Sequence, residues 1–141
     1  MRGRILVDTN VVLDVLLNRE PFADASAAVW AGIETGSWHG MLAAHAVTTI
    51  HYIVRREMGS ARSRRTISAL LKVFKVAAVD DVVIEEALRL AFADFEDAVT
   101  AAAAQATGCE YIVTRDPKGF RDSPVKAVMP EVLLPLLLRL H

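Results

Sequence analysis

The sequence predicts an α/β fold, a three-layer α/β/α sandwich with a mainly parallel central sheet. Short apolar segments alternate along the chain with longer segments whose apolar residues recur at helical spacing. Strands separated by helices need crossover connections, which make the strands parallel and cover both faces of the sheet. No repeat, low-complexity segment or linker divides the 141 residues, so we expect one domain spanning residues 1–141.

Five segments have the composition of short strands. The first is Arg-Ile-Leu-Val at residues 4–7, which stops abruptly at Asp8. The others are residues 38–43, 74–79, 111–113 and 125–128, the last as an edge strand. Helices are expected at residues 10–18, 23–35, 45–57, 62–71, 80–92 and 94–104, with a short terminal helix that opens at Pro130 and kinks at Pro135.

The composition favours a folded protein of the cytoplasm. Hydrophobic residues make up 53% of the chain and charged residues 23%, which argues against disorder. The lone cysteine, Cys109, forms no intramolecular disulfide and is expected to be a buried apolar residue. No segment is apolar for long enough to be a signal peptide or to span a membrane, so we expect no membrane association.

The net charge of −1 argues against nucleic acid binding unless the cations cluster. Seven of them fall in one stretch where Glu57 is the only acid: Arg55, Arg56, Arg62, Arg64, Arg65, Lys72 and Lys75. This stretch is equally typical of an ordinary solvated face.

Four aspartates are expected to meet at one edge of the sheet. Asp8 directly follows the first strand, and Asp116 lies three residues after the strand at 111–113. Asp94 and Asp97 share one face at the start of a helix. Ligands of such sheets bind beyond the carboxyl ends of the strands, which is where these side chains should lie.

Clustered carboxylates repel one another, and a divalent cation removes that repulsion. Hard oxygen ligands without suitably spaced Cys or His favour Mg²⁺ or Mn²⁺ over Zn²⁺. Such ions activate water and orient phosphodiesters.

Each acid also has a structural interpretation. Asp94 is at a natural N-cap position, Asp97 is favourable to the helix dipole, Asp8 can cap the first helix and Asp116 can begin a turn before Pro117.

Three segments resemble motifs of the PIN-domain family. Asp8-Thr9-Asn10 after an apolar strand is similar to the opening motif, and Asp94-Phe-Glu-Asp97-Ala-Val before an Ala-rich helix resembles the third acidic motif. Tyr111-Ile-Val-Thr-Arg-Asp116 resembles the fourth. The resemblance implies a nuclease-like α/β/α fold and metal-dependent RNA cleavage. Small stand-alone members of that family are often VapC-like toxins of toxin–antitoxin pairs. They are usually homodimers that a partner protein, the antitoxin, holds inactive, and the resemblance implies the same for this chain.

Carried over residue by residue, the resemblance makes Asp8, Asp97 and Asp116 metal ligands. Thr9 and Thr114 match the small hydroxyl residues that support the site, and Asn10 is expected to orient Asp8. The family usually has a further acid, commonly Glu, where this chain has Thr49. Asp94 is expected to supply the missing catalytic charge, whereas Glu96 is expected to point to another face of its helix.

These features predict a Mg²⁺- or Mn²⁺-dependent endoribonuclease whose Arg55, Arg56 and Arg115 guide the RNA backbone. The alternative is a PIN-like RNA- or protein-binding module whose turnover was lost with the acid at position 49. An aspartyl-phosphate phosphatase ranks last, because it typically needs a second Asp where this chain has Asn10. A dehydrogenase is excluded, since no Gly-rich turn follows the first strand.

Overall fold

The computed structural model describes residues 3–139, with side chains through residue 136. Its strands are β1 (Arg4–Val7), β2 (His39–Ala43), β3 (Lys75–Ala77), β4 (Tyr111–Val113) and β5 (Lys126–Val128). Its α-helices are α1 (Thr9–Leu16), α2 (Ala23–Glu34), α3 (Ala44–Met58), α4 (Ser60–Val73), α5 (Asp81–Leu90), α6 (Phe95–Ala106) and α7 (Pro130–Arg139), and η1 (Pro117–Phe120) is a short 3₁₀ helix. None of the described helices is long and apolar enough to cross a membrane.

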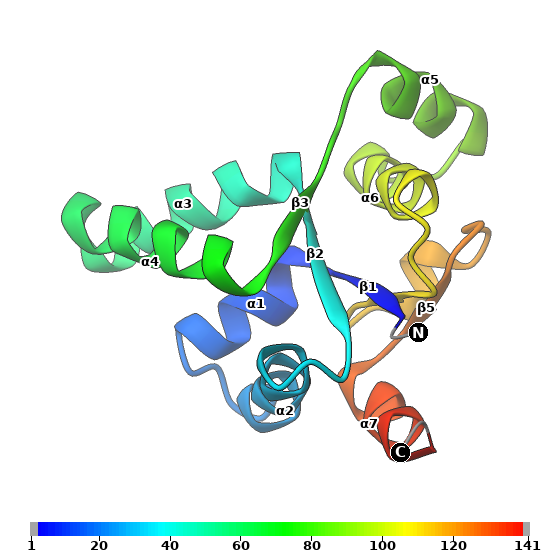
Figure 1. The fold of residues 1–141 in the computed structure, drawn as a ribbon. Coiled ribbons are helices and arrows are strands. Elements are labelled where there is room, and N and C mark those ends of the chain that lie inside the picture. Colours follow the sequence, from blue (N-terminus) through cyan, green and yellow to red (C-terminus); the bar gives the residue numbers. More distant parts are fainter. Residues whose placement is uncertain (1–2, 140–141) are drawn as a thin grey trace.

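The strands form one five-stranded sheet in the order β3-β2-β1-β4-β5, and every pair is parallel (Figure 1). The chain begins in the centre, moves outward to β3, and then crosses over to β4 on the other side of β1. The strand order therefore reverses between β1 and β4, which is where sheets of this type bind ligands. The predicted α/β/α fold and parallel sheet are confirmed, with β5 as an edge strand.

Successive residues of the inner strands enter two different cores. Ile5 and Val7 of β1 pack with residues of α1, α2, α3, α4 and α7 on one face of the sheet. Leu6 between them packs with residues of α5 and α6 on the other. This alternation is the period of a pleated strand, and burial on both faces explains why β1 is a continuous apolar run.

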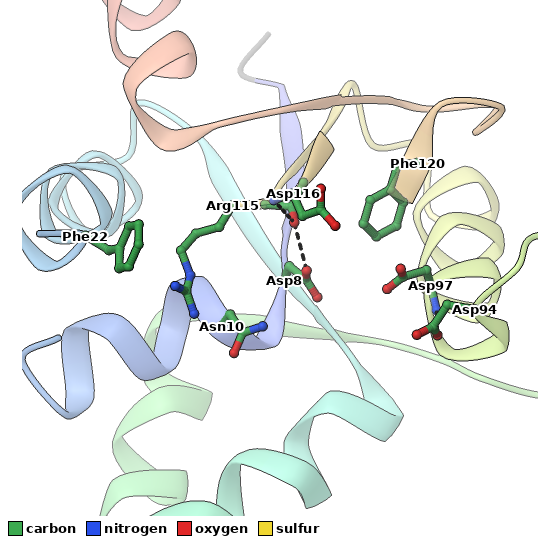
Figure 2. Close-up of a pocket in the computed structure, with 9 residues that line it drawn as sticks. Asp8, Asn10, Phe22, Asp94, Asp97, Arg115, Asp116 and Phe120 are labelled. Carbon is green, nitrogen blue, oxygen red and sulfur yellow. Dashed lines mark hydrogen bonds between the residues drawn. The ribbon is translucent and has the colours of Figure 1, made fainter. Parts of the chain in front are cut away.

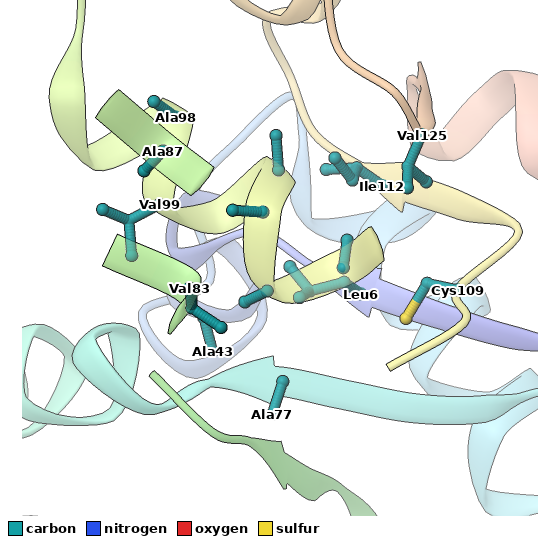
Figure 3. Packing of buried hydrophobic residues seen from close by; sticks show 14 of the residues in the cluster. Leu6, Ala43, Ala77, Val83, Ala87, Ala98, Val99, Cys109, Ile112 and Val125 are labelled. Carbon is teal, nitrogen blue, oxygen red and sulfur yellow. The ribbon is translucent and has the colours of Figure 1, made fainter. Parts of the chain in front are cut away.

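Small side chains bring α6 close to the sheet. Six residues of α6 from Ala98 to Ala104 belong to the second core, and five of them are alanine. Figure 3 shows two of them, Ala98 and Val99, above Ala43 and Ala77 of the sheet. Cys109 is a buried free thiol at the edge of the same core, as predicted.

The element boundaries differ modestly from those predicted. Helix α1 starts at Thr9 because Asp8 is its N-cap, and η1 lies between the strands predicted at residues 111–113 and 125–128. Trp38, expected at the start of a strand, lies just outside β2 and packs edge-on against Tyr111 in the first core. Helix α7 continues past Pro135. The kink expected there stays a prediction.

Gly40 in β2 is expected to tolerate no side chain. A Cβ at this position would lie 2.8 Å from Ile33 Cδ1 and 2.9 Å from Phe74 Cδ1. Overpacking of this kind is costly, so Gly40→Ala should lower the free energy of unfolding by about 2 kcal/mol in urea titrations. The exposed change Ser68→Ala is the control. Equal stabilities of Gly40→Ala and the wild type would show that the packing around β2 is looser than described.

Candidate active site

The ends of β1 and β4 bring two predicted site segments together. The Asp8 N–H donates to the Val113 carbonyl at 2.9 Å, and the Thr114 N–H donates to the Val128 carbonyl at 2.9 Å. These bonds continue the sheet ladder by one residue past each strand. Asp8 and Thr114 are therefore held side by side at the strand-order reversal.

A chain of hydrogen bonds then fixes the Asp8 carboxylate. Its Oδ2 accepts from the Thr114 hydroxyl at 2.9 Å, and its Oδ1 accepts from the Thr9 N–H at 2.9 Å. Thr114 Oγ1 in turn accepts from the Asp116 N–H at 3.1 Å. The buried Thr114 thus connects the two acids at the strand ends.

Helix α6 contributes the other acids. Asp94 is its N-cap, and Asp94 Oδ1 accepts from the Asp97 N–H at 3.1 Å. The capping role proposed for Asp94 is confirmed. The cap leaves the partly buried Asp97 side chain free to point toward Asp8 (Figure 2).

One cavity of about 540 Å³ joins these side chains. It is lined by Asp8, Asn10, Phe22, Asp94, Asp97, Thr114, Arg115, Asp116 and Phe120. All four predicted aspartates therefore border the same space, although they come from three separate segments of the chain. In Figure 2, Asp94 and Asp97 lie on one side of Asp8, whereas Phe22 and Arg115 lie on the other.

The acids raise one another's proton affinity. The pKa of Asp97 is raised to about 6, first by burial and then by the negative charges of Asp94, Asp8, Asp116 and Glu96. Burial also raises the pKa of Asp8, against the opposing hydrogen bonds from Thr114 and Thr9. The cavity is thus short of positive charge.

The donor set fits a hard divalent cation. Every acid in the cavity offers carboxylate oxygens, which Mg²⁺ and Mn²⁺ prefer. Gly119 leaves an open space between two of them, since a Cβ there would lie 3.0 Å from Asp97 Oδ2 and 3.6 Å from Asp116 Oδ2. Among residues 3–136, however, no three Asp, Glu, His or Cys side chains form a preassembled metal cage. Side-chain movement would accompany binding.

A smaller neighbouring cavity of about 240 Å³ shares Asp8, Asn10, Asp94 and Asp97 with the first. Thr49 lines it, and the Thr49 hydroxyl donates to the His45 carbonyl at 3.4 Å. Glu96, in the first turn of α6, lines it as well, and its charge contributes to the raised pKa of Asp97. The expectation that its side chain points to another face of the helix stays a prediction.

His45 also lines the smaller cavity. His45 Nε2 lies 3.3 Å from Thr100 Oγ1, which itself donates to the Glu96 carbonyl at 3.0 Å. Burial lowers the pKa of His45, and the charges of Glu96 and Asp8 oppose that shift.

The three predicted RNA-contacting arginines have different surroundings. Arg115 lines the larger cavity, where its Nε lies 3.0 Å from Asp14 Oδ2 and its guanidinium lies over the Phe22 ring. Arg55 and Arg56 are exposed in the last turn of α3 and line neither described cavity.

Sequence reasoning missed Asp14, Phe22 and Gly119. Asp14 carried a usable signal, because it is an acid at a core position within the apolar run Val-Val-Leu-Asp-Val-Leu-Leu. It is fully buried on α1. Burial raises its pKa, and the charges of Arg115 and Arg19 oppose that rise. Phe22 and Gly119 carried no signal, since only the tertiary fold places them beside the acids.

The fold and the site define an α/β/α protein with a carboxylate-lined cavity where the strand order reverses. The chain belongs to the PIN-domain family, whose family model matches residues 4–118. No curated protein sequence matches the chain.

Solved structures with this fold include three from bacteria. A toxin–antitoxin complex from Klebsiella pneumoniae is 21% identical over 89% of this chain and 97% of that one, with a TM-score of 0.68. FitAcB from Neisseria gonorrhoeae is 21% identical over 90% and 98%, with a TM-score of 0.70. Mycobacterium tuberculosis VapC20, described as a sarcin–ricin loop cleaving toxin, is 19% identical over 77% and 86%, with a TM-score of 0.62.

The raised pKa of Asp97 predicts a pH-dependent penalty on folding. A carboxyl whose pKa rises from 3.8 to about 6 on folding destabilises the folded state as the pH increases through that range. Without divalent cations, Asp97→Asn should therefore match the wild type near pH 4 and exceed its free energy of unfolding by about 2 kcal/mol at pH 7. Urea titrations at both pH values measure this difference. A difference that does not change with pH would contradict the raised pKa of Asp97.

Proposed function

We propose that this protein is a Mg²⁺- or Mn²⁺-dependent endoribonuclease. The observation that supports the proposal most strongly is the lining of one cavity by Asp8, Asp94, Asp97 and Asp116. These acids raise the pKa of Asp97, and such crowding is typical of sites that hold a cation. Membership of the PIN-domain family is consistent with nuclease chemistry.

Asp8, Asp97 and Asp116 would hold the cation, and hydrogen bonds support each of them. Thr114 orients Asp8 and fixes the Asp116 backbone, while Asp94 fixes the backbone of Asp97. The Thr9 N–H adds a second hydrogen bond to Asp8, and Asp94 adds negative charge. Asn10 lines the same cavity, and its role in orienting Asp8 is part of the proposal. When bound, a divalent cation activates water and neutralises charge on a phosphodiester.

The basic stretch supports an RNA substrate. Its seven cations lie on α3, α4 and β3, are all exposed, and leave the remainder of the chain acidic. Arg55 and Arg56 on α3 would attract the RNA backbone without regard to its sequence.

We also propose that the protein is the toxin of a toxin–antitoxin pair, a cytoplasmic homodimer that a protein antitoxin inhibits. Two of the similar solved structures point this way: the one from Klebsiella pneumoniae is a toxin–antitoxin complex, and VapC20 from Mycobacterium tuberculosis is described as a toxin. The support here is similarity of fold together with the PIN-domain family.

Cleavage assays test the nuclease proposal. Purified protein, freed of co-purifying partners, is incubated with structured and unstructured RNAs in Mg²⁺, Mn²⁺ or chelator. We expect metal-dependent cleavage that falls at least a hundredfold in Asp8→Ala and Asp97→Ala, because each change removes a proposed ligand. Glu85→Gln, an exposed acid outside the described cavities, is the matched control and should cleave normally. Cleavage that persists in chelator, or in both alanine variants, would contradict the proposal.

A second candidate is a PIN-like module that binds RNA or protein without turnover. Two observations favour it. Thr49 supplies no charge where the family usually has an acid, and no preassembled cage of acids exists within residues 3–136. In that case RNA would bind with the same affinity in Mg²⁺ and in chelator.

The two candidates differ in how they respond to an acid at position 49. Thr49→Glu would place a carboxylate in the smaller cavity beside Asp8 and Asp97, so Mn²⁺ should bind about tenfold more tightly, as measured by calorimetry. Thr48→Glu adds the same charge on the exposed face of α3 and serves as the control. If Thr49→Glu cleaves RNA and the wild-type protein does not, the natural chain is the binding module. If the wild type and Thr49→Glu both cleave RNA, Thr49 is compatible with catalysis.

A further inference from the structure

The larger cavity has two chemically different sides. Asp94, Asp97 and Asp116 supply the acidic side, whereas Phe22, Arg115 and Asn10 lie around the opposite side of Asp8 (Figure 2). The proposed metal chemistry uses only the acids. The aromatic ring and the planar guanidinium are therefore unexplained by it.

The charge of Arg115 is already compensated within the protein. Arg115 Nε lies 3.0 Å from Oδ2 of Asp14, whose side chain is 0% exposed. Arg19 lies farther from the same carboxylate, with Nη1 3.9 Å from Oδ1. A buried acid of this kind needs a charged partner, so Arg115 is not available as a free cation for the RNA backbone.

Arg115 also packs against an aromatic ring. Its Cζ lies 4.2 Å from the centroid of the Phe22 ring, a close cation–π contact. The Arg115 side chain is 27% exposed and Phe22 is 36% exposed, and both line the cavity. The ion pair with Asp14 holds Arg115 beside the ring, so Asp14 acts as a positioning residue for this contact.

We propose that Phe22 and Arg115 form a stacking subsite for an unpaired nucleobase next to the phosphodiester that is cleaved. This inference rests on the proposed function and adds to it the local form of the substrate. Single-stranded RNA is typically bound by stacking of splayed bases on aromatic rings and guanidinium planes. The exposed amide of Asn10, on the same side, can hydrogen-bond to the edge of a base.

A base fits this side of the cavity better than a phosphate does. A phosphate would find a neutralised arginine close to four carboxylates, whereas a base is uncharged and gains from the apolar ring. A base within a duplex is stacked between its neighbours and must unstack before it can bind here, so the subsite would select unpaired RNA.

Fluorescence of 2-aminopurine tests the subsite directly. Single-stranded ribo-hexamers that each carry one 2-aminopurine are titrated with Asp97→Asn protein in Mg²⁺, where the proposed function predicts no cleavage. We expect the fluorescence to be quenched in at least one hexamer, with about tenfold weaker binding once Phe22→Ala is added. Phe22→Tyr should retain the quenching. Leu88→Ala, which removes an exposed apolar side chain of α5 outside both cavities, should have no effect.

Arg115→Lys separates stacking from charge. Lysine keeps the positive charge opposite Asp14 but lacks the planar group, so stacking predicts that the quenching is lost. A role in attracting phosphate predicts that Arg115→Lys binds like its parent. Thermal unfolding of each variant checks that the fold is retained.

The outcomes separate this inference from the nuclease proposal. Quenching that depends on Phe22 and on the arginine plane supports the subsite, even if no RNA is cleaved by the wild-type protein. Three results would overturn the subsite, even if metal-dependent cleavage is established. They are no quenching in any hexamer, equal quenching by Phe22→Ala and its parent, and equal quenching with a base-paired probe.

Discussion

Repulsion among the aspartates at the carboxyl edge of the sheet is the constraint on which the rest of this site depends. The parallel sheet brings Asp8 and Asp116 together, and α6 adds Asp97 to the same cavity. Burial, and then this repulsion, raise the pKa of Asp97 to about 6. Such a site is stable only because the surrounding fold is well packed, with two aliphatic cores on opposite faces of the sheet.

Hydrogen bonds around the acids hold them close together despite this repulsion. Thr114 donates to Asp8, and Asp94 accepts from the backbone of Asp97. These bonds hold the acids in place without neutralising them, so the cavity keeps its affinity for positive charge. The one arginine in the larger cavity does not neutralise them either, because Arg115 is paired with the buried Asp14. The charges therefore remain available to a cation from solution.

Much of this arrangement could be predicted from sequence, for physical reasons. Strands β1 and β4 were predicted with their observed bounds, because strands buried on both faces are uninterrupted apolar runs. The location of the aspartates followed from the rule that parallel strands end at one edge. Phe22 and the pairing of Asp14 with Arg115 could not be predicted, because they depend on how the loop after β4 and the segment before α2 meet α1. Sequence periodicity describes faces of a helix, but it does not say what each face meets.

Direct detection of bound Mn²⁺ by electron paramagnetic resonance tests the central claim, that the crowded aspartates form a cation site. Titration of the purified wild-type protein at pH 7, beside Asp8→Asn and Asp97→Asn, would count bound ions without requiring the right RNA. The account predicts saturable binding by the wild type that weakens at least tenfold in both variants, since each loses a charged ligand. Wild-type binding no stronger than that of the two variants would contradict it, and the acids would then have to be explained without a metal.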